Sequence, residues 1–309
     1  MNFAERPLWL VGFRPFFALA CLAGLSLPLL WAMMFTGALP APAGDISPVQ
    51  WHAHEMFFGF GWAVLGGFLL TSTKNWVGSR GYHGWPLIFL VGAWLFERVG
   101  MSFGGSWPQP LFLLSNNLFL GSIVAMILWT LIRHRDKDSY RIDNLFFLVI
   151  LPAFLLAKNL LLSTNFMEEG EALALGLFRI AFLVMLERTL TQFMKSVFQV
   201  NILRHPVLDR SIKLLAVALL AESLLPPHAS AALMLLLAAL LLGRFFFWKP
   251  QLGLRRIDIG VMYLGYLAIV AELLLQVGAE HLNIVGVGSV AMHTFTFGAM
   301  GLVIPAMLV

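Results

Sequence analysis

Residues 228–248 read HASAALMLLLAALLLGRFFFW, a run in which nearly every side chain is apolar. A run of about twenty apolar residues is long enough to cross the hydrocarbon core of a bilayer as an α-helix. Similar runs recur along the chain, and the composition agrees with them, with 60% hydrophobic and 12% charged residues. An ordinary globular domain has roughly a quarter charged residues. Because the runs are continuous rather than alternating, they favour helices over a β-barrel. The sequence therefore predicts an all-α, polytopic transmembrane helix bundle embedded in a lipid bilayer.

Hydropathy predicts about ten spans within a single integral membrane domain that covers residues 1–309. The predicted spans lie near residues 16–36, 54–73, 84–101, 110–132, 143–163, 171–190, 211–227, 228–248, 258–278 and 286–309. The loops between them are short, and no second domain or clear repeat is evident. The single cysteine, Cys21, excludes an intramolecular disulfide.

The basic residues predict the orientation of the bundle. Most of the 20 lysines and arginines either precede the first predicted span or lie around the turn that follows an even-numbered span. Arg133, Arg135 and Lys137, for example, follow the fourth span. The loops on the opposite side carry none. By the positive-inside rule the amino terminus is cytoplasmic. The net charge of +4 therefore reflects membrane topology, and we expect no nucleic-acid partner.

Ionisable residues inside spans are rare and costly, so each suggests a functional site. With this orientation, most of them fall in the outer half of the membrane. They are Glu97, Arg98, Lys158, Arg179, Glu222, Glu272 and His293. The asymmetry indicates one polar site that opens toward the outer face. The alternative is that acids and bases neutralise each other as structural ion pairs, for example Glu97 with Arg98, or Lys158 with a glutamate of another helix.

The most distinctive local motif is His52-Ala53-His54-Glu55-Met56. Imidazole, thioether and carboxylate groups all bind transition metals. On a regular helix, residues two apart face nearly opposite directions. Either the start of this span is irregular and both imidazoles bind one metal, or His52 and His54 serve different sites. The simpler alternative is a pair of interfacial histidines that hydrogen-bond to headgroups and loop carbonyls.

A third histidine, His293, lies inside the last predicted span in the stretch His293-Thr294-Phe295-Thr296-Phe297-Gly298. It binds either a metal or a polar group of a neighbouring helix. Gly59 and Gly66 allow close approach to the second span, either by another helix or by a flat macrocycle.

The chain resembles the NnrS family of bacterial inner-membrane proteins. The resemblance is carried by Gly12-Phe13-Arg14-Pro15-Phe16-Phe17, by the His52–Met56 motif with Phe58-Gly59-Phe60, and by shorter matches as far as Gly301. It implies a multi-pass inner-membrane protein of about twelve spans that contains haem and copper. It also implies a role in denitrification and in the response to nitric oxide, or nitrosative stress.

Two features depart from the family pattern. Glu187-Arg188-Thr189 and the residues that follow lack the proline usual near the sixth span. The family also continues beyond the tenth span, so we expect a C-terminal segment to be missing here.

Together these observations predict a haem or copper site toward the periplasmic face. We expect His52, His54 and His293 to bind metal, and Arg14, Glu55, Glu97 and Arg98 to contact the cofactor. A sensor, a scavenger and a reductase would share such a site, so the sequence does not decide whether the protein is an enzyme, nor what donates electrons to it. The alternatives are a transporter of a small ion and a metal-handling assembly factor.

Overall fold

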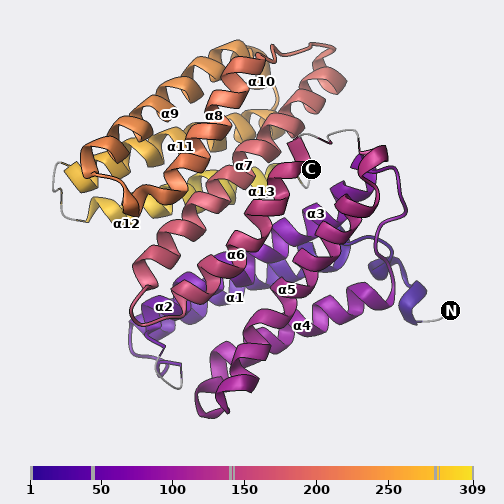
Figure 1. The fold of residues 1–309 in the computed structure, drawn as a ribbon, viewed down its shortest axis with the longest axis vertical. Helices are drawn as coiled ribbons and strands as arrows, with labels where there is room; N and C mark the ends of the chain where they lie inside the picture. Colours follow the sequence, from indigo (N-terminus) through magenta and orange to yellow (C-terminus); the bar gives the residue numbers. More distant parts are fainter. Residues whose placement is uncertain are drawn as a thin grey trace. The chain divides into compact units, whose positions relative to one another are not determined.

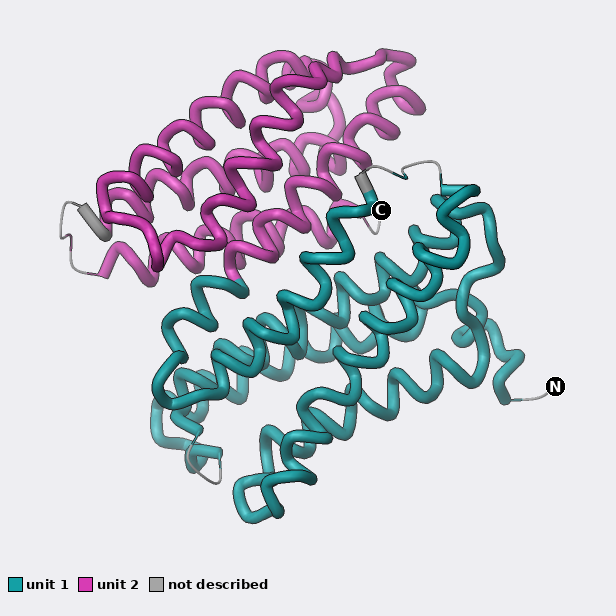
Figure 2. The backbone as a smooth tube through the Cα atoms, in the orientation of Figure 1, with its two compact units in different colours: residues 1–174 teal, residues 175–309 magenta. Residues whose placement is uncertain are grey.

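The computed structural model describes residues 3–42, 46–138, 141, 143–281, 284 and 286–307. The described residues are overwhelmingly helical and contain no strand, which confirms the predicted all-α class (Figure 1). The chain divides into two compact units, which we call unit 1 (residues 1–174) and unit 2 (residues 175–309) (Figure 2).

Unit 1 contains five membrane-length segments, one of which joins two α-helices through a π-helix. Its main helices are α1 (Phe13–Phe35), α2 (Pro48–His54), the π-helix η3 (Glu55–Gly61), α3 (Trp62–Trp76), α4 (Trp85–Phe103), α5 (Gln109–Arg133) and α6 (Phe147–Leu161). Short 3₁₀ turns lie at Phe3–Glu5 (η1), Pro7–Trp9 (η2), Gly104–Ser106 (η4), Arg135–Lys137 (η5) and Asp143–Phe146 (η6). Helix α7 (Met167–Phe198) begins in unit 1 and continues in unit 2.

Unit 2 repeats this mixture of long helices and one interrupted helix. Its further elements are α8 (Pro206–Ala218), the 3₁₀ segment η7 (Leu219–Leu224), α9 (Pro227–Phe247), α10 (Pro250–Gly253), α11 (Ile257–His281), α12 (Val287–His293), the π-helix η8 (Thr294–Met300) and α13 (Gly301–Ala306). Helix α11 packs against α9, α12, η8 and α13.

Eight helical segments among the described residues are long and apolar enough to cross a membrane. They are Phe13–Phe35, Pro48–Trp76, Trp85–Ser106, Gln109–Arg133, Asn144–Leu161, Pro227–Phe247, Ile257–Ala279 and Val287–Ala306. The other two predicted spans do not coincide with a helix of this length and apolar character. Residues 171–190 lie within the charged helix α7, and residues 211–227 cover the end of α8 and η7, where Ala221 departs from helical geometry (φ −101°, ψ 22°). Ten spans and a cytoplasmic amino terminus therefore stay predictions.

Small residues and apolar surfaces explain how unit 1 packs. A Cβ atom added at Gly66 of α3 would lie 2.6 Å from Cδ1 of Ile123 on α5, so this glycine admits a neighbouring helix. On α1, the exposed side chains include Leu25 and Cys21. An apolar side chain without protein contacts suits a helix face in contact with lipid.

A capping box fixes the start of α2 and thereby positions the histidine motif. Ser47 Oγ accepts a hydrogen bond from the Gln50 backbone N–H at 3.1 Å, and Gln50 Oε1 accepts one from the Ser47 N–H at 3.3 Å. Pro48 occupies the first helical turn, where its missing N–H is tolerated. Gln50 Nε2 donates to the Leu161 carbonyl at 2.7 Å, which ties α2 to the end of α6.

Candidate functional site

Five ionisable side chains meet in the interior of unit 1. They come from four elements: His54 from α2, Glu55 from η3, Glu97 and Arg98 from α4, and Lys158 from α6. His54, Glu55, Glu97 and Lys158 are each exposed by 1% or less, and the Arg98 side chain by 12%. We call this group the buried cluster. Charges this deep in a bundle are tolerated only when they are paired.

Glu97 is the centre of the buried cluster. Lys158 Nζ donates hydrogen bonds to Glu97 Oε1 and to the Asn116 carbonyl. Arg98 Nη2 lies 2.6 Å from Glu97 Oε1, and Arg98 Nη1 lies 3.0 Å from Glu55 Oε2. Two carboxylates therefore face two cations, and the charges balance while His54 is neutral. The ion-pair alternative raised by the sequence is present in the structure.

His54 lies between the two carboxylates without a close hydrogen bond. Its Nδ1 is 3.4 Å from Glu55 Oε1, and its Nε2 is 3.5 Å from Glu97 Oε1. Among the described residues, six buried side-chain atoms of the cluster make no hydrogen bond of good geometry: His54 Nε2, Glu55 Oε2, Glu97 Oε2 and the Nε, Nη1 and Nη2 atoms of Arg98. Arg98 Nη1 and Nη2 are nevertheless within ion-pair distance of the two carboxylates. Buried polar atoms are nearly always satisfied, so unsatisfied ones at one place suggest an additional ligand.

Gly59 makes room for the guanidinium of Arg98. A Cβ atom at Gly59 would collide with Arg98 Nη1 and would lie 2.9 Å from Glu55 Oε2. Trp94 Nε1 donates to the Gly59 carbonyl at 3.0 Å, and the Arg98 guanidinium carbon lies 5.2 Å from the centre of the Trp94 ring. The close approach predicted at Gly59 is therefore made by a charged side chain from α4.

The two sequence motifs around His54 and His293 adopt the same local structure. Each histidine is the last residue before a seven-residue π-helix, η3 after His54 and η8 after His293. Each is followed by three residues and then Phe-Gly. The His54 ring lies 5.6 Å from the Phe58 ring, and the His293 ring lies 5.9 Å from the Phe297 ring. Short π-helices are frequent at functional sites.

His293 is exposed at the surface of unit 2, and one of its ring nitrogens contacts a backbone carbonyl. Its Nδ1 lies 2.8 Å from the Ser289 carbonyl oxygen. A carbonyl only accepts, so Nδ1 is the ring nitrogen placed to donate this hydrogen bond. Metal-binding histidines commonly have this arrangement, in which one ring N–H donates to a carbonyl and the other nitrogen binds the metal.

His52 and Arg14 lie apart from the buried cluster. The His52 ring stacks on Trp31 of α1, with centroids 4.5 Å apart and planes 17° from parallel. Arg14 is exposed at the start of α1, where its Nη1 donates to the Pro7 carbonyl at 2.7 Å. Thus His54, Glu55, Glu97 and Arg98 come together as candidate site residues, whereas His52 and Arg14 do not join them.

Unit 2 contains charged pairs of its own, whose partners could not be predicted from the sequence. Arg179 donates to both oxygens of Glu272, from Nε at 3.0 Å and from Nη2 at 2.5 Å. Glu187 pairs with Arg204, Lys213 and Arg244. Charged groups therefore occur within unit 2 as well as in the buried cluster of unit 1, and the single outward-facing polar site stays a prediction. The spacing of these residues along the chain gave no signal of their partners, because the pairing follows from which helices pack together.

Among the described residues, no three His, Cys, Asp or Glu side chains are arranged to hold a metal ion. Haem needs from the protein only one or two axial ligands. His54, whose Nε2 makes no hydrogen bond, and His293, whose Nδ1 contacts a backbone carbonyl, are the imidazoles that fit that requirement.

The family model described as NnrS protein matches residues 7–309, which is nearly the whole chain. No curated protein and no solved structure matches.

Proposed function

The chain belongs to the NnrS family, and on this premise we propose that it is a haem-binding membrane protein of the nitric oxide response. His54 in unit 1 and His293 in unit 2 are the proposed metal ligands, each considered within its own unit. The observation that carries the proposal is the shared local structure, in which each histidine directly precedes a π-helix and packs on a phenylalanine four residues later.

Charge balance supports haem over a bare copper ion at His54. The buried cluster already pairs two carboxylates with Arg98 and Lys158. A copper ion would add an uncompensated positive charge to a buried site, which is strongly unfavourable. Ferrous iron within a dianionic porphyrin adds no net charge at its core. Haem iron supplies an open coordination position for a diatomic ligand such as nitric oxide.

The residues around His54 have defined roles in this proposal. Glu55 and Glu97 flank the imidazole and restrict its orientation, as carboxylates near metal-bound histidines do. Lys158 and Arg98 hold Glu97 in place from two sides. Arg98 is the least buried member of the cluster, and its guanidinium is the group suited to a haem propionate. His52 is assigned to packing on Trp31 rather than to the metal.

The test is metal and haem analysis of the full chain, purified in detergent from haem-replete cells. We expect haem in the unmodified protein and a shift of its absorption bands on addition of nitric oxide. His54→Gln and His293→Gln should each lose haem or change its spectrum. His52→Phe preserves an aromatic ring for stacking on Trp31, so this control should retain haem. A haem-free preparation would contradict the proposal and favour a transporter or an assembly factor.

A further inference from the structure

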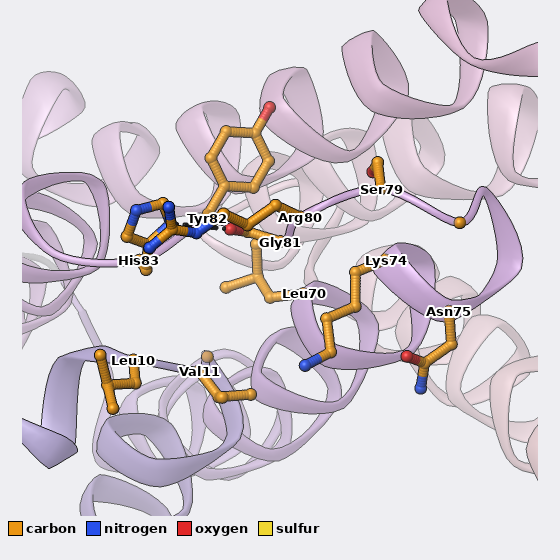
Figure 3. Close-up of a pocket in the computed structure, with 12 residues that line it drawn as sticks. Leu10, Val11, Leu70, Lys74, Asn75, Ser79, Arg80, Gly81, Tyr82 and His83 are labelled. Carbon is orange, nitrogen blue, oxygen red and sulfur yellow. Dashed lines mark hydrogen bonds between the residues drawn. The ribbon is translucent and has the colours of Figure 1, made fainter.

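A second polar site lies at the opposite end of α3 from the buried cluster and has no part in the proposed function. It is a pocket of about 480 Å³, formed within unit 1 by the start of α1, the last turns of α3 and the loop that follows. Its lining includes Leu10, Val11, Leu70, Lys74, Arg80 and His83. In Figure 3 the Lys74 side chain extends into the space between Leu10 and Val11 on one side and the loop of Arg80 to His83 on the other.

The surroundings of this pocket are basic. An adjoining hollow of about 350 Å³ shares Lys74 and Arg80 with it and adds Arg133 and His134. Among the residues that the structure describes, no carboxylate lines either space. Within the described parts of the chain, Lys74, Arg80 and Arg133 form no ion pair. Lys74 and Arg80 at the pocket, with Arg133 in the adjoining hollow, create a positive potential that attracts an anion.

Hydrogen bonds hold the loop that forms the pocket. Tyr82 Oη donates to the Met126 carbonyl at 3.0 Å and accepts from Thr130 Oγ1 at 3.1 Å, which attaches the loop to α5. The Gly84 N–H donates to the Trp9 carbonyl at 2.7 Å. Gly84 has a φ of +65°, a conformation that glycine adopts readily. These hydrogen bonds therefore fix the position of the loop and with it the shape of the pocket.

Aromatic residues indicate that this end of unit 1 lies at a membrane surface. Trp85 begins α4 and is 65% exposed, and Trp129 in the last turns of α5 is 62% exposed. Exposed tryptophans at span ends are typical of the membrane–water interface. The pocket itself has an apolar wall of Leu10, Val11 and Leu70 facing the basic groups. That combination suits a ligand with a negative head and an apolar body.

We propose that this pocket binds a phosphate-bearing anion through Lys74 and Arg80. Its position and its apolar wall point to the headgroup of an anionic phospholipid as the source. Basic pockets between membrane helices recognise such headgroups. Inorganic phosphate carries the same kind of charged group but has no apolar body. Competition between phosphate and phospholipid therefore distinguishes the two sources.

The test is native mass spectrometry of the detergent-purified full chain during titration with phosphatidylglycerol, with phosphatidylcholine of the same acyl chains in parallel. We expect selective binding of phosphatidylglycerol. The variant Lys74→Gln/Arg80→Gln should weaken it roughly 25-fold, since each basic residue near a membrane surface contributes about five-fold. The control Arg210→Gln/Arg255→Gln removes the same charge from exposed positions outside the pocket and should bind normally. The conservative variant Lys74→Arg/Arg80→Lys should retain selectivity.

Inorganic phosphate provides the second arm. If millimolar inorganic phosphate displaces phosphatidylglycerol from the unmodified chain and fails to do so in Lys74→Gln/Arg80→Gln, the pocket binds the phosphate group itself. If phosphate has no effect while the lipid selectivity depends on Lys74 and Arg80, the lipid is the ligand. Equal binding of both lipids together with no phosphate effect would overturn the proposal. So would equal loss of binding in the pocket variant and the Arg210→Gln/Arg255→Gln control.

Discussion

Lys158 on α6 donates a hydrogen bond to Glu97 on α4, and neither side chain is more than 1% exposed. The two residues are 61 positions apart in the chain, so their pairing holds two spans in register within unit 1. Arg98 adds a second positive group to the same carboxylate and connects it to Glu55. The stability of unit 1 should therefore depend on this pair.

Breaking the pair on one side should be strongly destabilising. Glu97→Gln leaves Lys158 and Arg98 facing only one carboxylate, and loss of one partner from a buried ion pair costs about 3–5 kcal/mol. The thermal unfolding midpoint in detergent, followed by tryptophan fluorescence, should fall clearly below that of the unmodified chain.

The double variant Glu97→Gln/Lys158→Met is the control for that experiment. It removes both charges of the pair, so its midpoint should lie above the value expected from adding the two single effects. Strict additivity of Glu97→Gln and Lys158→Met would show that the two side chains do not interact.

Gly59→Ala should disturb the buried cluster through its volume alone. The added methyl group would occupy the position of Arg98 Nη1, so the guanidinium must leave Glu55. We expect a lower unfolding midpoint and increased hydrogen exchange around η3. Gly92→Ala on α4 is the matched control, because a Cβ there meets nothing within 4 Å. That substitution should leave stability unchanged or raise it by up to about 1 kcal/mol. Equal behaviour of the two variants would contradict the assigned role of Gly59.

The contribution of the Arg179–Glu272 pair to the stability of unit 2 should depend on its two parallel hydrogen bonds. Arg179→Lys keeps the charge but replaces two parallel hydrogen bonds by one point contact, and loss of a charge-assisted bond costs roughly 1.5–3 kcal/mol. The unfolding midpoint is the measurement. Arg256→Lys is a suitable control, because Arg256 makes an equally bidentate pair with Asp258 at the surface. Surface ion pairs contribute little, so we expect almost no change. If the unfolding midpoint falls by a similar amount in both variants, burial does not determine how much such an ion pair contributes to stability.

Tyr82→Phe should loosen the loop that forms the basic pocket. The substitution removes the hydroxyl that donates to Met126 and accepts from Thr130. We expect faster hydrogen exchange across residues 77–84 and a modest loss of global stability, since each of the two lost hydrogen bonds contributes about 1 kcal/mol. Unaltered exchange would show that the loop does not depend on this contact.

Hydropathy was sufficient to predict most of the fold. The apolar runs mark eight helices of membrane length, because each run must satisfy its own backbone hydrogen bonds in hydrocarbon. The spans predicted near 171–190 and 211–227 are not among these eight helices, so hydropathy alone was not sufficient to assign these two segments. Arg179 and Glu187 sit inside α7, and Ala221 interrupts the helical geometry after α8.

Helix geometry offered the separation of His52 from His54 as one of two alternatives. Residues two apart on a helix face different directions, and in the structure one ring stacks on Trp31 while the other enters the buried cluster. The sequence predicted the residues that contact His54 only as candidate site residues at a similar depth in the membrane. That Lys158 meets Glu97, and that π-helices follow His54 and His293, depends on packing between segments far apart in the chain.

The optical spectrum of the purified chain, oxidised and then reduced, tests the central claim most directly. If His54 and His293 bind haem, the unmodified protein shows a Soret band that is lost or shifted in His54→Gln and in His293→Gln. The band persists in His52→Phe, and circular dichroism shows the same helix content in every variant. A colourless unmodified protein, or a Soret band identical in all of these variants, would contradict the account.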